Sequence, residues 1–133
     1  MGAIHEIVFD CHQPKALAQF WATLLDGYDM RPQDDNELAR LADMGLDPAD
    51  LRSVMLDGPG PSLCFQNVEG QQPDNNRVHF EIAVPNRAGE VARLQANGAE
   101  IERVLPTYTV MKDPEGNQFC LVDRHVQHAA VAA

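Results

Sequence analysis

The chain has 133 residues, a length typical of one domain with a hydrophobic core. Its formal net charge of -10 argues against nucleic acid and anionic membrane surfaces as partners, because both attract clustered Lys and Arg. Hydrophobic residues make up 44% of the chain, yet no apolar run reaches the ~18–20 residues that span a bilayer. We therefore expect an acidic, soluble, single-domain protein.

The cysteines and the N-terminus predict a cellular location. Cys11, Cys64 and Cys120 are widely spaced, and no Cys-x-x-Cys pair occurs. Each lies within a strand-like run, so we expect buried, reduced thiols. The first residues lead directly into a strand pattern, without the basic and apolar leader of a secreted protein. Both observations predict a cytoplasmic protein.

The first half of the chain predicts a strand, a helix and a hairpin. Phe9 and Glu6 fall on opposite faces of the strand, because side chains alternate with period two. Trp21 belongs to an apolar stripe at helical spacing, which predicts packing on a sheet. The expected elements are a strand at 4–11, a helix at 15–25, and strands at 53–56 and 62–68 around a turn at 57–61.

Residues 32–52 are less regular than their surroundings. Asn36 can cap a helix that carries Leu41, and residues 47–51 predict another short helical turn. This polar helical segment can lie over the mouth of a cavity.

After a polar linker at 70–76 the order of elements starts again. Two modules, at about 4–69 and 77–123, are therefore expected. Their sheets can join edge to edge around a concave trough, which is where a ligand belongs. The second module is expected to contain a strand at 77–84, a helix after Asn86, strands at 100–105, 107–112 and 118–123, and a frayed tail at 124–133.

The strand at 77–84 has one apolar face and one face with side chains that can take part in proton transfer. His79 and Glu81 point one way, and a carboxylate beside an imidazole can act as a general base or orient the ring. The alternative is an ion pair between Glu81 and Arg77. The apolar face is expected to hold Val78, Phe80, Ile82 and Val84.

Five motifs stand in order along the chain, at 9–14 with 18–21, 63–68, 76–81, 92–94 with 97–99, and 113–120. Together they resemble the vicinal oxygen chelate superfamily, which includes glyoxalase I, extradiol dioxygenases and bleomycin-binding proteins. The chain looks most like the glyoxalase-like domain group common in actinobacterial genomes. The resemblance covers residues 4–123 and implies an α+β fold, with two βαβββ modules forming a curved mixed sheet around a central trough.

The resemblance also implies a ligand set. Metal-dependent members place ligands on the first and last strands of each module, and counting along the strands gives Glu6 and Gln66, then His79 and Cys120. The first match can slip to His5. The implied cofactor is a divalent metal (Zn, Ni, Fe or Mn), with Glu6, Gln66 and His79 as candidate ligands. The alternative is that no metal binds and that His79 hydrogen-bonds Glu6 or Gln66 across the bottom of the trough.

Cys120 departs from the family pattern. Glyoxalase I is expected to carry a glutamate there as ligand and base, so proton abstraction from a hemithioacetal has no obvious agent and a standard glyoxalase I is not expected. Cys120 can be a ligand or nucleophile, or a small apolar filler. Tyr108, on a late strand, can line the trough with its ring and hydroxyl.

The sequence thus predicts a glyoxalase-like protein that binds a small organic molecule, with lyase, isomerase or dioxygenase chemistry. His79 and Glu81 are the catalytic candidates; Glu6, Gln66, Cys120 and Tyr108 are the ligand-binding candidates. The alternative is a protein that sequesters a drug or metabolite without chemistry. The resemblance further implies a homodimer, because small members of the superfamily often dimerise.

Overall fold

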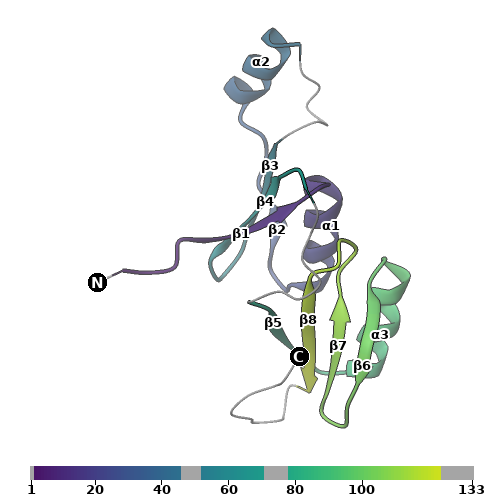
Figure 1. The fold of residues 1–133 in the computed structure, drawn as a ribbon. Helices are drawn as coiled ribbons and strands as arrows, with labels where there is room; N and C mark the ends of the chain where they lie inside the picture. Colours follow the sequence, from purple (N-terminus) through teal and green to yellow (C-terminus); the bar gives the residue numbers. More distant parts are fainter. Residues whose placement is uncertain (1, 46–51, 71–77, 124–133) are drawn as a thin grey trace. The chain divides into compact units, whose positions relative to one another are not determined.

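The computed structural model describes residues 2–45, 52–70 and 78–123 and divides into two compact units, residues 1–70 and 71–133 (Figure 1). Each unit contains a four-stranded mixed sheet. The elements of the first unit are β1 (Glu6–Cys11), α1 (Pro14–Leu24), β2 (Asp29–Met30), α2 (Asp35–Asp43), β3 (Ser53–Asp57) and β4 (Ser62–Asn67). Those of the second are β5 (Phe80–Val84), α3 (Arg87–Ala96), β6 (Glu100–Val104), β7 (Tyr108–Lys112) and β8 (Gln118–Asp123).

The first sheet has the strand order β1-β4-β3-β2, with β1 and β4 parallel and the other neighbours antiparallel. Helix α1 covers the face that carries Phe9, whose ring centroid lies 5.3 Å from that of Trp21 and 4.8 Å from that of Phe65. Along β1 the side chains alternate between more and less exposed, as the sequence predicts. The core of this unit therefore lies between α1 and the sheet.

Helix α1 begins at Pro14, which suits the first turn because its missing N–H has no partner there. Its buried side chains recur at helical spacing and include Leu17, Phe20, Trp21 and Leu24. The residue after the helix, Leu25, is already extended. The predicted stripe is confirmed, and Trp21 is a core residue that is only 1% exposed.

The second sheet repeats this plan, with the order β5-β8-β7-β6 and β5 parallel to β8. Asn86 caps α3 as predicted, since its side chain accepts a hydrogen bond from the Gly89 N–H at 3.2 Å. Leu94 of α3 is fully buried, as are Phe119 and Leu121 of β8. Both units are thus βαβββ modules, with α2 added between β2 and β3 of the first, and the predicted α+β class is confirmed. The trough between the modules stays a prediction.

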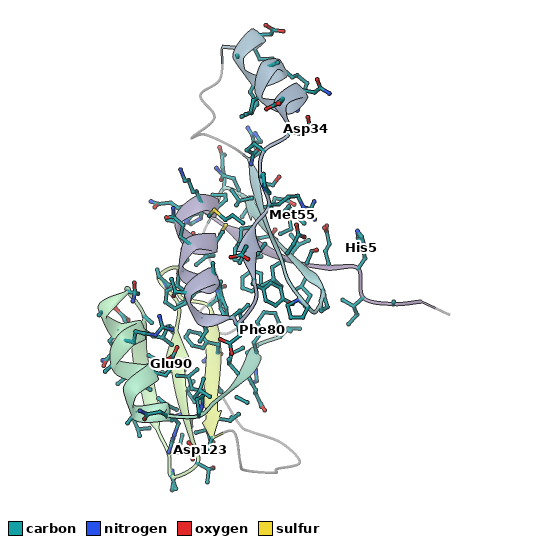
Figure 2. All side chains as sticks on the ribbon, turned by 180° about the vertical axis from the view of Figure 1, so that it is seen from behind. His5, Asp34, Met55, Phe80, Glu90 and Asp123 are labelled. Carbon is teal, nitrogen blue, oxygen red and sulfur yellow. The ribbon has the colours of Figure 1, made fainter. Side chains whose placement is uncertain are left out.

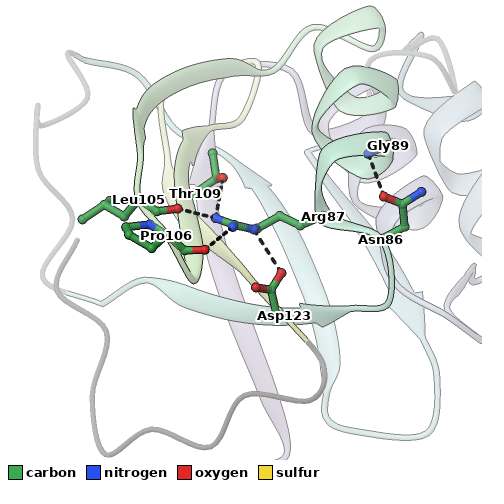
Figure 3. A network of polar contacts seen from close by, with 7 residues as sticks. All are labelled: Asn86, Arg87, Gly89, Leu105, Pro106, Thr109 and Asp123. Atoms are coloured by element: carbon green, nitrogen blue, oxygen red, sulfur yellow. Dashed lines mark hydrogen bonds and ion pairs between the residues drawn. The ribbon is translucent and has the colours of Figure 1, made fainter.

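Arg87, the first residue of α3, ties the helix to the loop between β6 and β7 and to the end of β8 (Figure 3). Its Nη1 donates to the Leu105 carbonyl at 2.8 Å, and its Nη2 donates to the Pro106 carbonyl at 2.6 Å. Its Nε donates to Asp123 at 3.1 Å. These bonds fix how the β6–β7 loop, which leads into Tyr108, leaves the sheet.

In the first unit an ion pair, which we call the Arg31–Asp57 clasp, holds the short strand β2. Arg31 donates through Nε and Nη2 to the two carboxylate oxygens of Asp57, both at 2.7 Å, and Ser62 Oγ donates to Asp57 Oδ1 at 2.7 Å. These bonds lower the pKa of Asp57 to about 2, the guanidinium contributing more than the hydroxyl. The Arg31 guanidinium, the Asp57 carboxylate and the Ser62 hydroxyl thus join β2, at the edge of the sheet, to β3 and β4.

Several expected boundaries need correction. Strand β1 begins at Glu6 rather than at residue 4, and β5 begins at Phe80, so His79 lies just before the strand. Val78 is 75% exposed and does not share the buried face expected for it. Asp34, not Asn36, caps α2 by accepting the Asn36 N–H at 2.8 Å. Strand β2, of two residues, was not expected.

Other expectations fall wholly or partly outside the described residues. They are the helical turn at 47–51, most of the linker at 70–76, Arg77 as a partner of Glu81, and the tail at 124–133. No helix in the described ranges has the length and apolar composition needed to cross a bilayer.

Truncating Trp21 tests the packing of α1. Replacing a fully buried aromatic side chain by Ala leaves a cavity, so Trp21→Ala should lower the free energy of unfolding by about 3–5 kcal/mol. Urea unfolding followed by circular dichroism measures this, with Val78→Ala as the control because Val78 is exposed. A loss below about 1 kcal/mol would show that α1 does not hold the core.

The Arg31–Asp57 clasp predicts a pH dependence. The folded-state pKa of Asp57 lies below its ordinary value of 3.8, so its contribution to stability is present above that value. The contribution is lost as the pH falls through about 2. The unfolding free energy of the native protein should therefore fall more steeply between pH 4 and pH 2 than that of Asp57→Asn. Asp26→Asn, which changes an exposed carboxylate without a clasp, should keep the native slope; equal slopes for all three proteins would contradict the clasp.

Candidate functional site

One face of each sheet is covered by a helix, α1 in the first unit and α3 in the second. We call the opposite face of each sheet the helix-free face. In the first unit this face carries Glu6, because Glu6 alternates with the helix-facing residues Ile7 and Phe9. In the second it carries Cys120, which alternates with Phe119 and Leu121. All the site residues predicted from the sequence belong to one of these two faces, or to the residue just before a strand.

The second unit brings four predicted residues to its helix-free face. Cys120 lies opposite Glu81 in the parallel pair of β5 and β8, and Tyr108 lies opposite Val122, two residues from Cys120. His79 Nε2 lies 3.9 Å from Glu81 Oε2, a separation within ion-pair range but longer than a hydrogen bond. The imidazole and carboxylate side chains are 25% and 31% exposed. The predicted pairing of His79 with Glu81 is therefore present.

Cys120 is fully buried at the centre of this face. Burial raises the pKa of its thiol to about 11, and the nearby carboxylate of Glu81 raises it further, with Arg103 opposing. A thiol with this pKa is neutral at pH 7, whereas nucleophilic attack requires the thiolate. Its chemistry therefore favours the apolar filler over the nucleophile.

A polar cluster that the sequence did not predict borders the same face. Gln118 Nε2 donates to Glu102 Oε2 at 2.8 Å, and Lys112 Nζ lies 3.8 Å from Glu102 Oε1. Gln118 is the residue of β8 two positions before Cys120, and it is buried. The strand register places these three side chains together, since they belong to three neighbouring strands.

The first unit places Glu6 and Gln66 on one face but at different levels. Glu6 lies opposite Ser62, and Gln66 lies opposite Asp10. Four residues along a strand span about 13 Å, so the register brings Gln66 beside Asp10 and not beside Glu6. His5, the alternative first-strand match, is exposed on the segment before β1 (Figure 2).

The two registers also show which residues of the units are equivalent. Glu6 and His79 each lie seven residues before the residue that caps the following helix, Gln13 in one case (13 − 6) and Asn86 in the other (86 − 79). Val8, two residues after Glu6, pairs with Cys64. Glu81, two residues after His79, pairs with Cys120. The equivalent of Cys120 is therefore Cys64, and not Gln66 as counting along the chain had suggested.

Cys64 resembles Cys120 in its surroundings. It is 7% exposed, and burial raises the pKa of its thiol, as does the carboxylate of Glu6, while Arg31 opposes the shift. Because Arg31 is held by Asp57, its charge stands at a fixed place on this face. Each unit thus presents a buried neutral thiol on its last strand, flanked by a first-strand side chain that can carry charge.

The residues that the resemblance implies as metal ligands do not form a metal site within either unit. Glu6 and Gln66 lie at separate levels of one sheet. Across residues 2–45, 52–70 and 78–123, no group of three or more His, Cys, Asp or Glu side chains is placed to hold a metal ion. The predicted ligand set draws on both units, so a metal site stays a prediction, and no step proposed below uses a metal.

Comparison with known proteins identifies the family. A family model described as glyoxalase-like domain matches residues 6–122. No curated protein matches the chain.

Solved structures show the same fold at low sequence identity. The fosfomycin resistance protein FosX from Mesorhizobium loti has a TM-score of 0.66 at 10% identity, over 92% of this chain and 91% of that one. A glyoxalase/bleomycin resistance protein/dioxygenase family enzyme from Burkholderia phytofirmans has a TM-score of 0.61 at 12% identity, over 92% and 98% of the two chains. The trypanothione-dependent glyoxalase I of Leishmania major has a TM-score of 0.62 at 15% identity, over 93% and 88%.

These structural likenesses speak for the fold alone, whereas the family match covers most of the chain. The predicted superfamily is confirmed, and the actinobacterial grouping within it stays a prediction. The chain belongs to the glyoxalase-like domain family.

Proposed function

We propose that this protein binds a small organic molecule at the helix-free face of its second sheet, and that His79 and Glu81 move a proton on that molecule. One observation carries the proposal, the separation of 3.9 Å between His79 Nε2 and Glu81 Oε2. A ligand oxygen can lie at a hydrogen-bond distance of about 2.8 Å from both atoms, because the separation is less than twice that length.

The two side chains supply complementary proton chemistry. A carboxylate accepts a proton, and a protonated imidazole donates one near neutral pH. Of the reactions that the resemblance implies, a proton-transfer isomerisation moves a proton from one atom to another, and a lyase reaction removes a proton as the leaving group departs. Both side chains are partly exposed, so a ligand can reach them, while Cys120 beside them is buried and neutral.

Tyr108 and the Gln118–Glu102–Lys112 cluster give this face further polar contacts for a ligand. Glu6 and Gln66 are proposed as ligand contacts of the first unit. Both are exposed, and their separation along β1 and β4 means that they would contact different parts of a ligand.

The second candidate function is sequestration of a drug or metabolite without chemistry. The neutral thiol of Cys120 favours sequestration, because glyoxalase I is expected to have a glutamate at this position as its base, and a neutral thiol does not replace that carboxylate. Solved structures with this fold include a fosfomycin resistance protein and a glyoxalase/bleomycin resistance protein/dioxygenase family enzyme. Those names describe those proteins, and they make fosfomycin and bleomycin suitable probes here.

The acidic composition and the free cysteines support the remaining proposals on partners and location. A net charge of -10 disfavours nucleic acid and anionic membranes as partners. None of Cys11, Cys64 and Cys120 is in a disulfide, and all three are buried, which fits a reducing compartment such as the cytoplasm.

Thermal unfolding with three probes tests the binding site: fosfomycin, bleomycin, and the hemithioacetal of methylglyoxal and glutathione. A ligand at 100 times its Kd stabilises the folded state by about 2.7 kcal/mol, so at least one probe should raise the Tm of the native protein. His79→Ala should weaken that binding at least about tenfold, while its own unliganded stability changes by less than about 1 kcal/mol. His5→Ala, which removes an exposed histidine outside the sheet, should bind like the native protein.

The same variants separate the two candidate functions. If Glu81→Gln binds a probe but no longer converts it, the pair is catalytic; if the native protein binds a probe tightly and never converts it, the protein sequesters. Unfolding of His79→Ala would show that His79 is scaffold. Equal binding by His79→Ala and His5→Ala would contradict the proposed site.

A further inference from the structure

A shift of register within strand β6 brings Arg103 to the helix-free face of the second sheet. The pairing with β7 shifts between Ile101 and Arg103, so that Arg103 lies opposite Val110. Regular pairing would place Arg103 opposite the neighbouring residue of β7, on the face that α3 covers. Val110 in turn lies opposite Cys120, which belongs to the helix-free face. One extra residue in β6 therefore moves this guanidinium to the face of the proposed site.

Arg103 stands in the same row of side chains as Glu81. The row runs across the four strands from β6 to β5 and consists of Arg103, Val110, Cys120 and Glu81. Val110 and Cys120 are fully buried, and neither carries a charge at pH 7. The row therefore has a positive end at Arg103 and a negative end at Glu81. The Cα atoms of these two residues are about 14 Å apart, which is three strand spacings.

The charges at the two ends both act on the middle of this row. Burial has the largest effect on the Cys120 thiol and raises its pKa. Among the charged groups, the Glu81 carboxylate raises that pKa further and the Arg103 guanidinium lowers it. The charge of Arg103 is thus near enough to influence a molecule bound beside Glu81.

The carboxylate next to Arg103 in the chain is held in the neighbouring row. Glu102 accepts a hydrogen bond from Gln118 at 2.8 Å and lies 3.8 Å from Lys112 Nζ. Gln118 and Lys112 lie opposite each other, one row along the strands from the row of Arg103. The register shift thus assigns two adjacent opposite charges to different rows of one face.

We propose that Arg103 is a specificity-determining residue and that it selects small organic acids by binding their carboxylate. This inference rests on the proposed function, because His79 and Glu81 are taken as the other contact of the ligand. A guanidinium has parallel N–H donors that match the two oxygens of a carboxylate. Glu81, Glu102 and the net charge of -10 repel anions of higher charge, so the ligand is a monoanion and not a phosphate.

Titration of isotopically labelled protein with 4-hydroxybenzoate and 4-hydroxybenzamide, followed by nuclear magnetic resonance shifts, tests this proposal. The two probes share a ring and a hydroxyl, and only the first has a carboxylate. The native protein should bind 4-hydroxybenzoate at least about tenfold more tightly, because a hydrogen bond between charged groups contributes about that factor or more. Arg103→Met should abolish this preference. Arg93→Met, which removes an exposed arginine of α3, should keep it.

Glu102→Gln gives a second test that leaves Arg103 in place. The glutamine keeps an oxygen that can accept from Gln118, but it removes a negative charge beside the guanidinium. 4-Hydroxybenzoate should therefore bind this variant more tightly than the native protein, and 4-hydroxybenzamide should bind both equally. Weaker binding of 4-hydroxybenzoate would contradict the proposal. Circular dichroism checks that each variant is folded.

The selection by Arg103 and the role of His79 can fail separately. His79→Ala should weaken the binding of both probes, which share the hydroxyl, and keep the ratio of their dissociation constants. If Arg103→Met keeps that ratio while His79→Ala weakens both probes, the inference is wrong and the proposed function stands. If Arg103→Met loses the ratio while His79→Ala binds like the native protein, Arg103 keeps its role and the proposed pair is wrong.

Two results with the native protein would also overturn the inference. One is equal binding of 4-hydroxybenzoate and 4-hydroxybenzamide. The other is the absence of shifts with either probe up to about 50 mM, a concentration at which even a weak contact is detected. A loss of the preference in Arg93→Met as large as in Arg103→Met would show that the effect is not specific to the helix-free face.

Discussion

The parallel pairing of the first and last strands in each unit is the constraint on which the rest of the structure depends. Parallel neighbours cannot be joined by a tight turn, so the chain must cross over, and in both units a helix makes the crossover and covers one face. That coverage divides every strand into helix-facing side chains, such as Phe9 and Leu121, and side chains on the helix-free face. The position of each candidate site residue follows from this alternation.

The two units have equivalent strand registers but carry different side chains on their helix-free faces. The positions seven residues before the helix cap hold Glu6 in one unit and His79 in the other, while the last strands carry the equivalent thiols Cys64 and Cys120. In the second unit the imidazole has a carboxylate within 3.9 Å, and the proposed proton transfer depends on this pair. In the first unit the corresponding residue beside Cys64 is Val8, and the fixed charge is the clasped Arg31. The second unit is therefore the stronger candidate for chemistry.

The sequence predicted the parts of this structure that local patterns determine. The stripe containing Trp21, the cap at Asn86 and the boundaries of β8 all depend on residues close together in the chain. Register between distant strands does not, because it is set by loops and packing that periodicity does not report. For this reason the sequence predicts Gln66 as the equivalent of Cys120, and it predicts neither the register shift in β6 nor the Gln118–Glu102–Lys112 cluster. Counting back from the helix caps identifies Glu6 and His79 as equivalents, whereas Cys64 follows only from the strand register.

The equivalence of the two registers is the central claim of this account, and nuclear Overhauser effects between backbone protons measure it most directly. In isotopically labelled protein, the account predicts cross-strand contacts that link Val8 with Cys64 and Glu81 with Cys120. Contacts that instead link Val8 with Gln66, while Glu81 stays with Cys120, would contradict it. The two thiols would then no longer occupy equivalent places, and the common frame for the two faces would be lost.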